Sequence, residues 1–228
     1  MKLSISTTRR ETLLGWSYLL ISLFVLPFLL ELSNLLLAKP VSATVLNLVY
    51  FSVNFISVAV IFRRFLTASA KAALAAPWRC LRFAALGLFA YLVTMNLISH
   101  GIELIDPNFS NVNDNMVNHL SQEHRILMGI ATMFLAPISE ETLHRGLVFQ
   151  CLQRKNRFLA YSLSMLIFGA IHIMNYIGFS HWLTLLLCFV QYLPAGLVLA
   201  WAYEKTDTVI TPIIIHITIN QIGFAAMR

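Results

Sequence analysis

Long hydrophobic segments alternate with short polar or basic segments along the chain. A helix needs about 20 mainly apolar residues to cross the hydrocarbon core of a bilayer. Segments of about that length lie at 13–37, 42–62, 83–104, 126–152, 158–177, 182–203 and 208–227. The pattern predicts an all-α fold, a polytopic membrane helix bundle of about seven transmembrane helices. Because no internal repeat or second domain is evident, residues 1–228 are expected to form a single integral membrane domain.

The composition agrees with a chain that lies in a lipid bilayer. Hydrophobic residues make up 58% of the chain and charged residues only 11%, whereas soluble domains have about 25% charged residues. The net charge is +6, but the basic residues are spread among the connections between apolar segments. Membrane orientation explains this distribution, and no nucleic-acid partner is expected.

The basic residues are distributed unequally between the two sides of the predicted bundle. Twelve lie on one side: Lys2, Arg9, Arg10, Arg63, Arg64, Lys71, Arg79, Arg82, Arg154, Lys155, Arg157 and Lys205. Three lie on the other side: Lys39, Arg125 and Arg228. Since cytoplasmic connections are rich in Lys and Arg, the N-terminus is expected in the cytoplasm. An odd number of spans across the cell membrane then places the C-terminus outside.

Two connections are longer than the others. Residues 63–82 mix Lys and Arg with Ala, Leu and Trp, which fits either an amphipathic helix on the cytoplasmic membrane surface or an ordinary basic loop. Residues 105–122 are rich in Asn and lack an apolar period, which predicts an exposed external loop.

The fourth predicted span carries ionisable residues in the sequence SEETLHRG at 139–146. A charge at the bilayer centre costs about 2.5–3.5 kcal/mol on insertion scales, so such residues usually serve a function. Glu141 and Arg145 are four residues apart on one helical face, which predicts an internal ion pair. Glu140 is turned away from Arg145 by about 140° and is expected to point into a cavity. Pro137 is expected to kink the helix and open space for a site.

The alternative reading of this cluster is a group of charges that reaches the membrane surface along extended side chains. Glu140 lies about 14 residues from the outer end of its span and about 12 from the inner end. At about 1.5 Å per residue it is near the midplane, which a short glutamate side chain cannot leave. The depth therefore favours a functional role.

Two later spans each carry a polar pair at helical spacing. Phe168 and His172 share a face, so the aromatic ring is expected to pack beside the imidazole and hold it. His216 and Asn220 also share a face, and their N–H groups suit a developing oxyanion. Taken singly, each pair also fits a core histidine or a polar contact between helices. Three such faces on three late spans favour one common cavity.

Several other catalytic and metal-binding motifs are missing. Glu141 and His144 have the E-x-x-H spacing of di-iron bundles, but the sequence has no second copy. It contains neither the H-E-x-x-H of zincin metalloproteases nor the G-x-S-x-G of serine hydrolases. Three cysteines without a C-x-x-C pair are expected to be unpaired thiols.

Three motifs follow one another in the second half of the chain: E-E-x-x-x-R (Glu140, Glu141, Arg145), F-x-x-x-H (Phe168, His172) and H-x-x-x-N (His216, Asn220). In this order, and in three separate hydrophobic spans, they resemble the CPBP family. These CAAX prenyl endopeptidase and bacteriocin-processing proteins, also called the Abi family, are intramembrane endopeptidases. The resemblance covers about residues 125–225, the expected catalytic core.

The resemblance implies roles for these residues. Glu140 and His172 would activate the attacking water, and His216 and Asn220 would stabilise the oxyanion. The supporting residues would be Glu141, Arg145 and Phe168. Family members are described both as metal-dependent and as glutamate-dependent. Glu140, His172 and His216 could hold Zn²⁺ as three ligands with an open position, so the sequence leaves the cofactor open.

The expected activity is hydrolysis of a peptide bond in a membrane-associated protein or peptide, with the site opening toward the cytoplasmic side. By analogy with the family, cleavage in bacteriocin maturation or immunity is also consistent with the sequence. Two other classes of function remain open. One is a non-catalytic membrane scaffold or immunity factor that uses the polar pairs for packing. The other is a transporter with a polar site at the midplane. The sequence does not indicate an oligomeric state.

Overall fold

The computed structural model describes residues 3–227, and within that range all regular structure is helical. Along the chain the helices are α1 (Arg9–Leu20), η1 (Ile21–Val25), α2 (Leu26–Leu35), α3 (Ala43–Ile61), α4 (Arg63–Ala75), α5 (Pro77–Ile105), α6 (Val112–Ser121), α7 (Arg125–Ile130), η2 (Ala131–Leu135), α8 (Ala136–Glu141), η3 (Thr142–Phe149), α9 (Gln150–Gln153), α10 (Arg157–Ile173), η4 (Met174–Tyr176), α11 (Trp182–Thr206) and α12 (Ile210–Ala226). Of these, η1, η2 and η3 are π-helical and η4 is a 3₁₀-helix.

Among the described residues, six helical segments are long and apolar enough to cross a membrane: Arg9–Leu35, Ala43–Ile61, Pro77–Ile105, Arg125–Gln153, Arg157–Tyr176 and Trp182–Thr206. A seventh apolar helix, α12, has 17 residues and is shorter than the predicted segment 208–227. The predicted fold class, a polytopic all-α membrane bundle, is confirmed. Two residues of the charge count, Lys2 and Arg228, lie outside the described residues.

The surface of the bundle is rich in large apolar side chains. Phe28 of the span Arg9–Leu35 and Phe89 and Leu97 of the span Pro77–Ile105 are each more than 60% exposed. In a protein surrounded by water such exposure would be unfavourable, whereas hydrocarbon tails solvate these groups. The three cysteines are unpaired, as predicted.

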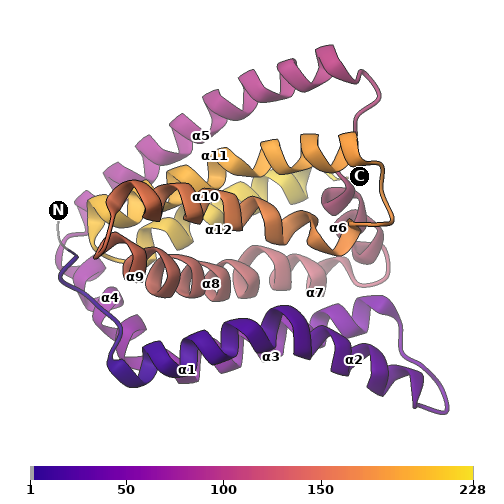
Figure 1. Ribbon diagram of the computed structural model, residues 1–228, viewed down its shortest axis with the longest axis horizontal. Coiled ribbons are helices and arrows are strands. Elements are labelled where there is room, and N and C mark those ends of the chain that lie inside the picture. Colours follow the sequence, from indigo (N-terminus) through magenta and orange to yellow (C-terminus); the bar gives the residue numbers. More distant parts are fainter. Residues whose placement is uncertain (1–2, 228) are drawn as a thin grey trace.

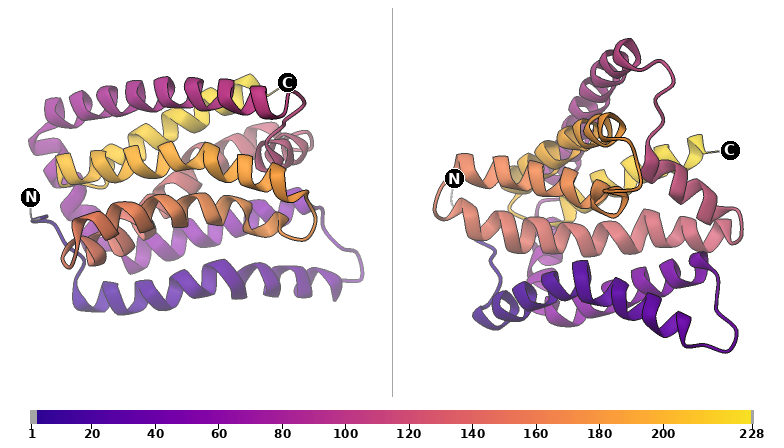
Figure 2. Two further views of the ribbon diagram at one scale, coloured as in Figure 1. Left: turned by 45° about the horizontal axis from the view of Figure 1, so that its top comes forward. Right: turned by 45° about the vertical axis from the view of Figure 1, so that its right-hand side comes forward.

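The segment Arg125–Gln153 is the central helix of the bundle. Of its most apolar stretch 56% is buried, against 11–44% for the other five spans. Figures 1 and 2 show α1 to α3 on one side of it, with α10 to α12 on the other and α5 outermost. The helix that carries the charged motif is therefore surrounded by protein.

The central helix widens on both sides of Pro137. The π-helical segment η2 ends two residues before this proline, and η3 begins five residues after it. Proline lacks an N–H group and its ring collides with the carbonyl four residues earlier, which a regular α-helix cannot accommodate. The first span repeats the arrangement, because η1 ends two residues before Pro27. π-Helical turns thus flank Pro137, and the kink and the opened space at this proline stay a prediction.

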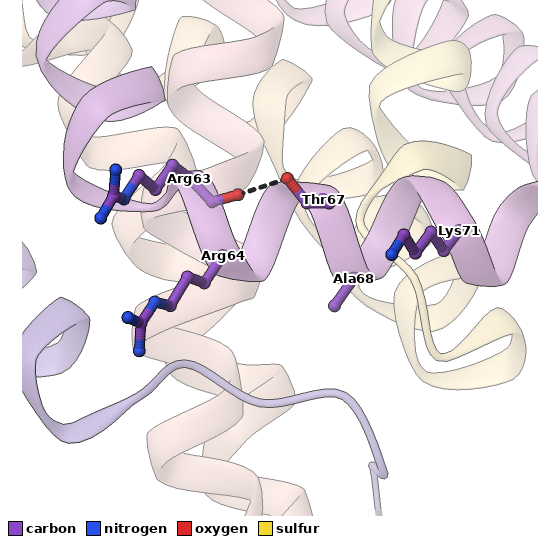
Figure 3. A pocket seen from close by; sticks show the side chains of 5 residues that line it. All are labelled: Arg63, Arg64, Thr67, Ala68 and Lys71. Carbon is purple, nitrogen blue, oxygen red and sulfur yellow. Dashed lines mark hydrogen bonds between the residues drawn. The ribbon is translucent and has the colours of Figure 1, made fainter.

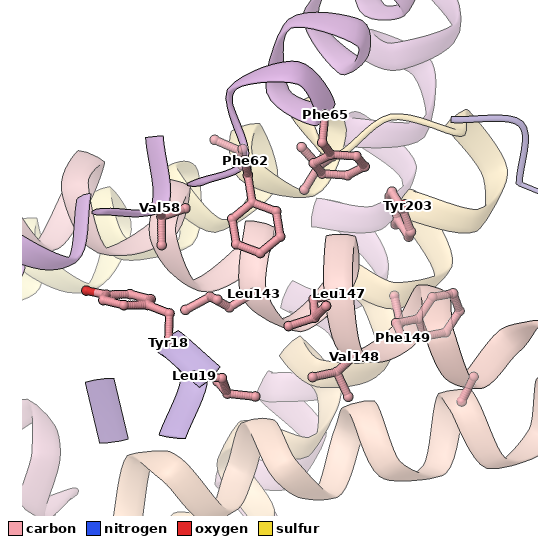
Figure 4. Packing of buried hydrophobic residues seen from close by; sticks show 14 residues of the cluster. Tyr18, Leu19, Val58, Phe62, Phe65, Leu143, Leu147, Val148, Phe149 and Tyr203 are labelled. Atoms are coloured by element: carbon pink, nitrogen blue, oxygen red, sulfur yellow. The ribbon is translucent and has the colours of Figure 1, made fainter. Parts of the chain in front are cut away.

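A hydrophobic core ties the N-terminal helices to the central one (Figure 4). Phe62 and Phe65 are almost fully buried between α3, α4 and η3. Glycines make room for both rings. A Cβ atom on Gly15 would lie 2.4 Å from Phe62, and one on Gly146 would lie 2.5 Å from Phe65. Close packing at these points holds α1 and α4 against the central helices.

The two long connections both contain helices. Residues 63–75 of the first form α4, so the helical alternative is the observed one there. The second connection contains α6, and its prediction as a loop without regular structure is wrong for residues 112–121. The Asn111 side chain accepts hydrogen bonds from the amides of Asn113 and Asp114. This N-cap starts a helix that has no strong apolar period.

Candidate active site

The buried ion pair that the spacing predicts is present on the central helix. Arg145 Nη1 lies 2.9 Å from Glu141 Oε1, and both side chains are fully buried. Arg145 Nη2 also donates to the carbonyl of Gly196 on α11, over 3.1 Å. The guanidinium therefore joins the central helix to a neighbouring span. Charge pairing and hydrogen bonds together offset the cost of burying the two charges.

His216 on α12 meets the same carboxylate. Its Nδ1 lies 2.8 Å from Glu141 Oε1, although the two residues are 75 positions apart. Because a carboxylate only accepts, Nδ1 carries the proton of this hydrogen bond. The other ring nitrogen, Nε2, lies 3.9 Å from Glu140 Oε2. Glu141 thus orients the imidazole so that Nε2 faces Glu140.

The two adjacent glutamates have different surroundings. The Glu141 side chain is fully buried, whereas that of Glu140 is 29% exposed. Glu140 Oε2 has no hydrogen-bond partner among the described residues. Glu140 is therefore a carboxylate with a free oxygen beside an imidazole, which is the arrangement a general base requires.

A hydrogen bond and a stacking contact hold the His172 ring in place. Its Nδ1 lies 2.7 Å from the carbonyl oxygen of Phe168, one turn earlier on α10. Its ring stacks on Tyr192 of α11, with centroids 4.2 Å apart and planes 23° apart. Since a carbonyl only accepts, Nδ1 donates this bond and Nε2 remains available to a ligand.

Phe168 is the ring around which the other groups gather. Its centroid lies 4.6 Å from that of His172, 5.6 Å from His216 and 6.2 Å from His144. The guanidinium carbon of Arg145 lies 4.8 Å from the same centroid. The three late spans do converge on one cluster, in which the buried Phe168 ring lies beside the guanidinium and the imidazole groups.

Asn220 contacts the backbone of the central helix. It follows His216 by one turn on α12, but its Nδ2 donates to the carbonyl oxygen of Thr132, over 2.8 Å. Thr132 belongs to the π-helical segment η2 of the central helix. One N–H of the amide thus holds α12 against the central helix, and the second N–H is left for a ligand.

The structure adds residues that the motifs did not indicate. Tyr192 stacks on His172, and its hydroxyl receives a hydrogen bond from Asn113 Nδ2 over 3.1 Å. His144 is buried beside Phe168, and its Nδ1 has no partner among the described residues. The E-x-x-H spacing had drawn attention to His144 only as part of an incomplete di-iron motif. Nothing in the sequence indicated Tyr192, which reaches the site from another helix.

The residues do not fit a metal centre in their present arrangement. Within residues 3–227, no three His, Cys, Asp or Glu side chains are grouped so that they could hold a metal ion. The proposed set of Glu140, His172 and His216 therefore does not form a Zn²⁺ site in this structure.

The part of the chain that carries the site is similar to a known protein family. Residues 122–222 match the family described as type II CAAX prenyl endopeptidase Rce1-like. This segment contains all three motifs, and the predicted resemblance is confirmed over these residues.

A curated relative matches part of the same chain. The UPF0177 protein YxdF of Lactococcus lactis subsp. lactis (strain IL1403) is 29% identical over 94 residues. The aligned region is 41% of this chain and 46% of that protein, so the chain spans about half of the length of this relative. No solved structure matches the chain.

Proposed function

We propose that this chain, similar over residues 122–222 to type II CAAX prenyl endopeptidase Rce1-like proteins, is an intramembrane endopeptidase. It would hydrolyse a peptide bond in a membrane-associated protein or peptide. The observation that carries the proposal is the position of His216 between the two glutamates, 2.8 Å from Glu141 and 3.9 Å from Glu140. This contact joins two of the three motifs in one buried cluster.

Water activation is assigned to Glu140 with His172. Glu140 has a free oxygen and partial access to its surroundings, so it can accept a proton from a water molecule. His172 presents Nε2 as an acceptor and can orient the same water, because its Nδ1 is held by Phe168. The water oxygen then attacks the carbonyl carbon of the substrate, and its proton passes to Glu140.

Stabilisation of the tetrahedral oxyanion is assigned to α12. Asn220 can donate its second amide N–H, and a protonated Nε2 of His216 can donate a second hydrogen bond. When the intermediate collapses, the leaving nitrogen takes the proton from Glu140 and the carbon–nitrogen bond breaks. Glu141 and Arg145 transfer no proton in this scheme. Their role is to hold His216 in place.

Entry of the substrate from the cytoplasmic end is part of the proposal. At the other end, the N-terminus of α6 lies over the site, because Asn111 and Asn113 hydrogen bond to Tyr192, the stacking partner of His172. His216 lies in the second turn of α12, six residues from its first residue. These positions favour an approach from the end of the bundle where α12 begins.

Replacement of Glu140 by Gln tests the catalytic assignment. The amide has nearly the shape of the carboxylate but cannot accept the proton, so we expect cleavage to fall by about 100-fold or more. Peptides that accumulate in membranes of cells with Glu140→Gln identify candidate substrates. Purified wild-type protein should cleave these peptides in proteoliposomes.

The matched control is Glu103→Gln, which changes an exposed glutamate on α5 in the same way. It should retain the wild-type rate. Equal cleavage by the Glu140→Gln and wild-type proteins would overturn the catalytic assignment and favour a scaffold that uses the polar residues for packing.

A further inference from the structure

The helix α4 carries basic side chains along its outer face. Arg63, Arg64 and Lys71 are exposed, and they line one surface pocket together with Thr67 and Ala68 (Figure 3). The pocket has a volume of about 420 Å³. Thr67 lies one turn after Arg63 and Arg64, and Lys71 lies one turn after Thr67, so these four residues form a single stripe.

The positive charge of this stripe is not neutralised by the protein. Among residues 3–227, none of the three basic side chains forms a salt bridge. The amides at the start of α4 are already used, because Glu11 Oε1 accepts from the backbone of Arg64 and Phe65 over 3.0 and 2.9 Å. An anion at this surface would therefore meet side chains rather than the helix terminus.

The location of α4 is that of a membrane surface. It connects the end of the span Ala43–Ile61 to the start of the span Pro77–Ile105, at the same end of the bundle as the N-terminus (Figure 1). Leu74, three residues after Lys71, and Trp78, at the start of α5, are exposed at 80% and 81%. Tryptophan favours the boundary between lipid headgroups and hydrocarbon, which places the basic stripe at headgroup level.

The inner face of α4 packs on the helices of the candidate site. Phe65 lies so close to Gly146 that an added Cβ would be 2.5 Å from its ring, and Gly146 directly follows Arg145. Ser69 accepts a hydrogen bond through its carbonyl from Thr208 Oγ1 over 2.8 Å, just before α12 begins. One short helix thus contacts both the central helix and the connection that leads to His216.

We propose that the basic stripe of α4 (Arg63, Arg64, Thr67 and Lys71) binds the phosphate headgroup of an anionic phospholipid. Guanidinium groups suit phosphate because they can offer two parallel hydrogen bonds, and Lys71 adds a third positive charge. The cytoplasmic leaflet, which the charge distribution assigns to this end, carries the anionic lipids. A bound lipid fixes α4, and through Phe65 and Ser69 it stabilises the helices that carry Arg145 and His216.

Lipid binding can be measured independently of any cleavage. Thermal unfolding of the purified full-length protein in neutral detergent is followed while dioctanoyl phosphatidylglycerol is titrated. We expect a saturable rise in the unfolding temperature. Dioctanoyl phosphatidylcholine and inorganic phosphate, at the same concentrations, should cause a much smaller rise, because one lacks net charge and the other lacks acyl chains.

A matched pair of variants locates the binding site. Arg64→Gln/Lys71→Gln should weaken the apparent affinity for phosphatidylglycerol by about 10- to 30-fold, since each basic residue near the membrane surface contributes about fivefold. Arg154→Gln/Lys155→Gln removes one Arg and one Lys from the exposed turn before α10 and should retain the affinity. The variant Arg64→Lys/Lys71→Arg keeps both charges and should also bind.

Three results would overturn the proposal. The first is an equal loss of affinity in the two Gln double variants. The others are a rise in unfolding temperature with phosphatidylcholine, or with inorganic phosphate, as large as that with phosphatidylglycerol. If Arg64→Gln/Lys71→Gln is unstable without lipid, the single Lys71→Gln variant provides the same comparison.

The influence of the bound lipid on catalysis rests on the proposed function. We expect vesicles containing phosphatidylglycerol to accelerate cleavage by the wild-type protein but not by the Arg64→Gln/Lys71→Gln variant. If the wild-type protein binds phosphatidylglycerol but cleaves no peptide, the proposed function is refuted and the lipid site is not.

Discussion

At the scale of single residues, the Glu141 carboxylate organises the site. Its Oε1 accepts from Arg145 Nη1 and from His216 Nδ1, over 2.9 and 2.8 Å. One oxygen thus fixes a guanidinium on its own helix and an imidazole on another. A buried carboxylate with two charged or polar partners is stable only while both are in place.

We predict that Glu141→Gln destabilises the protein by about 3–5 kcal/mol, because it leaves the fully buried Arg145 without a counter-charge. Thermal denaturation in detergent measures the change. The neighbouring Glu140→Gln substitution serves as the control, since Glu140 is partly exposed and should change stability by less than about 1 kcal/mol. Equal stability of the two variants would refute the structural role of the ion pair.

The spacing of residues predicted only contacts within one helix. Glu141 and Arg145 are four positions apart, and the ion pair follows from helical geometry even though π-helical turns intervene. The bond between Glu141 and His216 could not be derived in this way, because it depends on how α12 packs on the central helix. The same holds for Tyr192, which stacks on His172 from α11.

At the scale of the elements, small residues allow the spans to approach one another. A Cβ atom on Gly196 of α11 would lie 2.8 Å from the Cα atom of Met165 on α10. The Gly196 carbonyl also accepts the hydrogen bond from Arg145. In membrane bundles, close backbone approach of this kind supports van der Waals packing between helices. Gly196 therefore links helix packing to the geometry of the site.

We predict that Gly196→Ala destabilises the protein by about 1–3 kcal/mol, since the new methyl group meets backbone atoms that cannot rotate away. Cleavage should fall as well, because α11 must shift and this moves the carbonyl of residue 196 that holds Arg145. Gly101→Ala is the comparison, as an added Cβ there has no neighbour within 4 Å. That variant should be neutral or more stable by up to about 1 kcal/mol. The prediction fails if the two alanine variants have the same thermal stability.

Element boundaries also show where local signals were sufficient. Hydrophobic length located the spans to within a few residues, apart from the third, which begins at Pro77 rather than at 83. The polar helix α6 was missed because helices are recognised mainly by an apolar period, which this one lacks. Its start depends on the Asn111 cap, a signal that many loops also contain.

At the scale of the whole molecule, the two described ends of the chain lie at opposite ends of the bundle (Figure 1). This arrangement agrees with an odd number of crossings in which α12 is the last. The connections with the most basic residues lie at the N-terminal end. The direction of insertion then depends on the positive charge of these connections.

We predict that alkaline phosphatase fused after Ala226 is active in bacterial cells, whereas the same enzyme fused after Lys155 is inactive. This enzyme folds only where its disulfides form, outside the cytoplasm. A fusion after Ser180, in the connection between α10 and α11, should be active and controls for expression of a truncated chain. An inactive fusion after Ala226 would show that α12 does not cross the membrane or that the chain has the opposite orientation.

The sequence by itself determined the membrane location, the approximate spans and the Glu141–Arg145 pair, because these depend on hydropathy and helical spacing along one segment. Only the tertiary structure decided that His216 bonds to Glu141, that Tyr192 supports His172 and that Asn220 holds the central helix. The physical reason is that contacts between helices depend on packing. Packing is settled by residues such as Gly196, which lets two backbones approach, and Phe65, whose ring fills the space beside Gly146. No periodic pattern along the chain reveals these contacts.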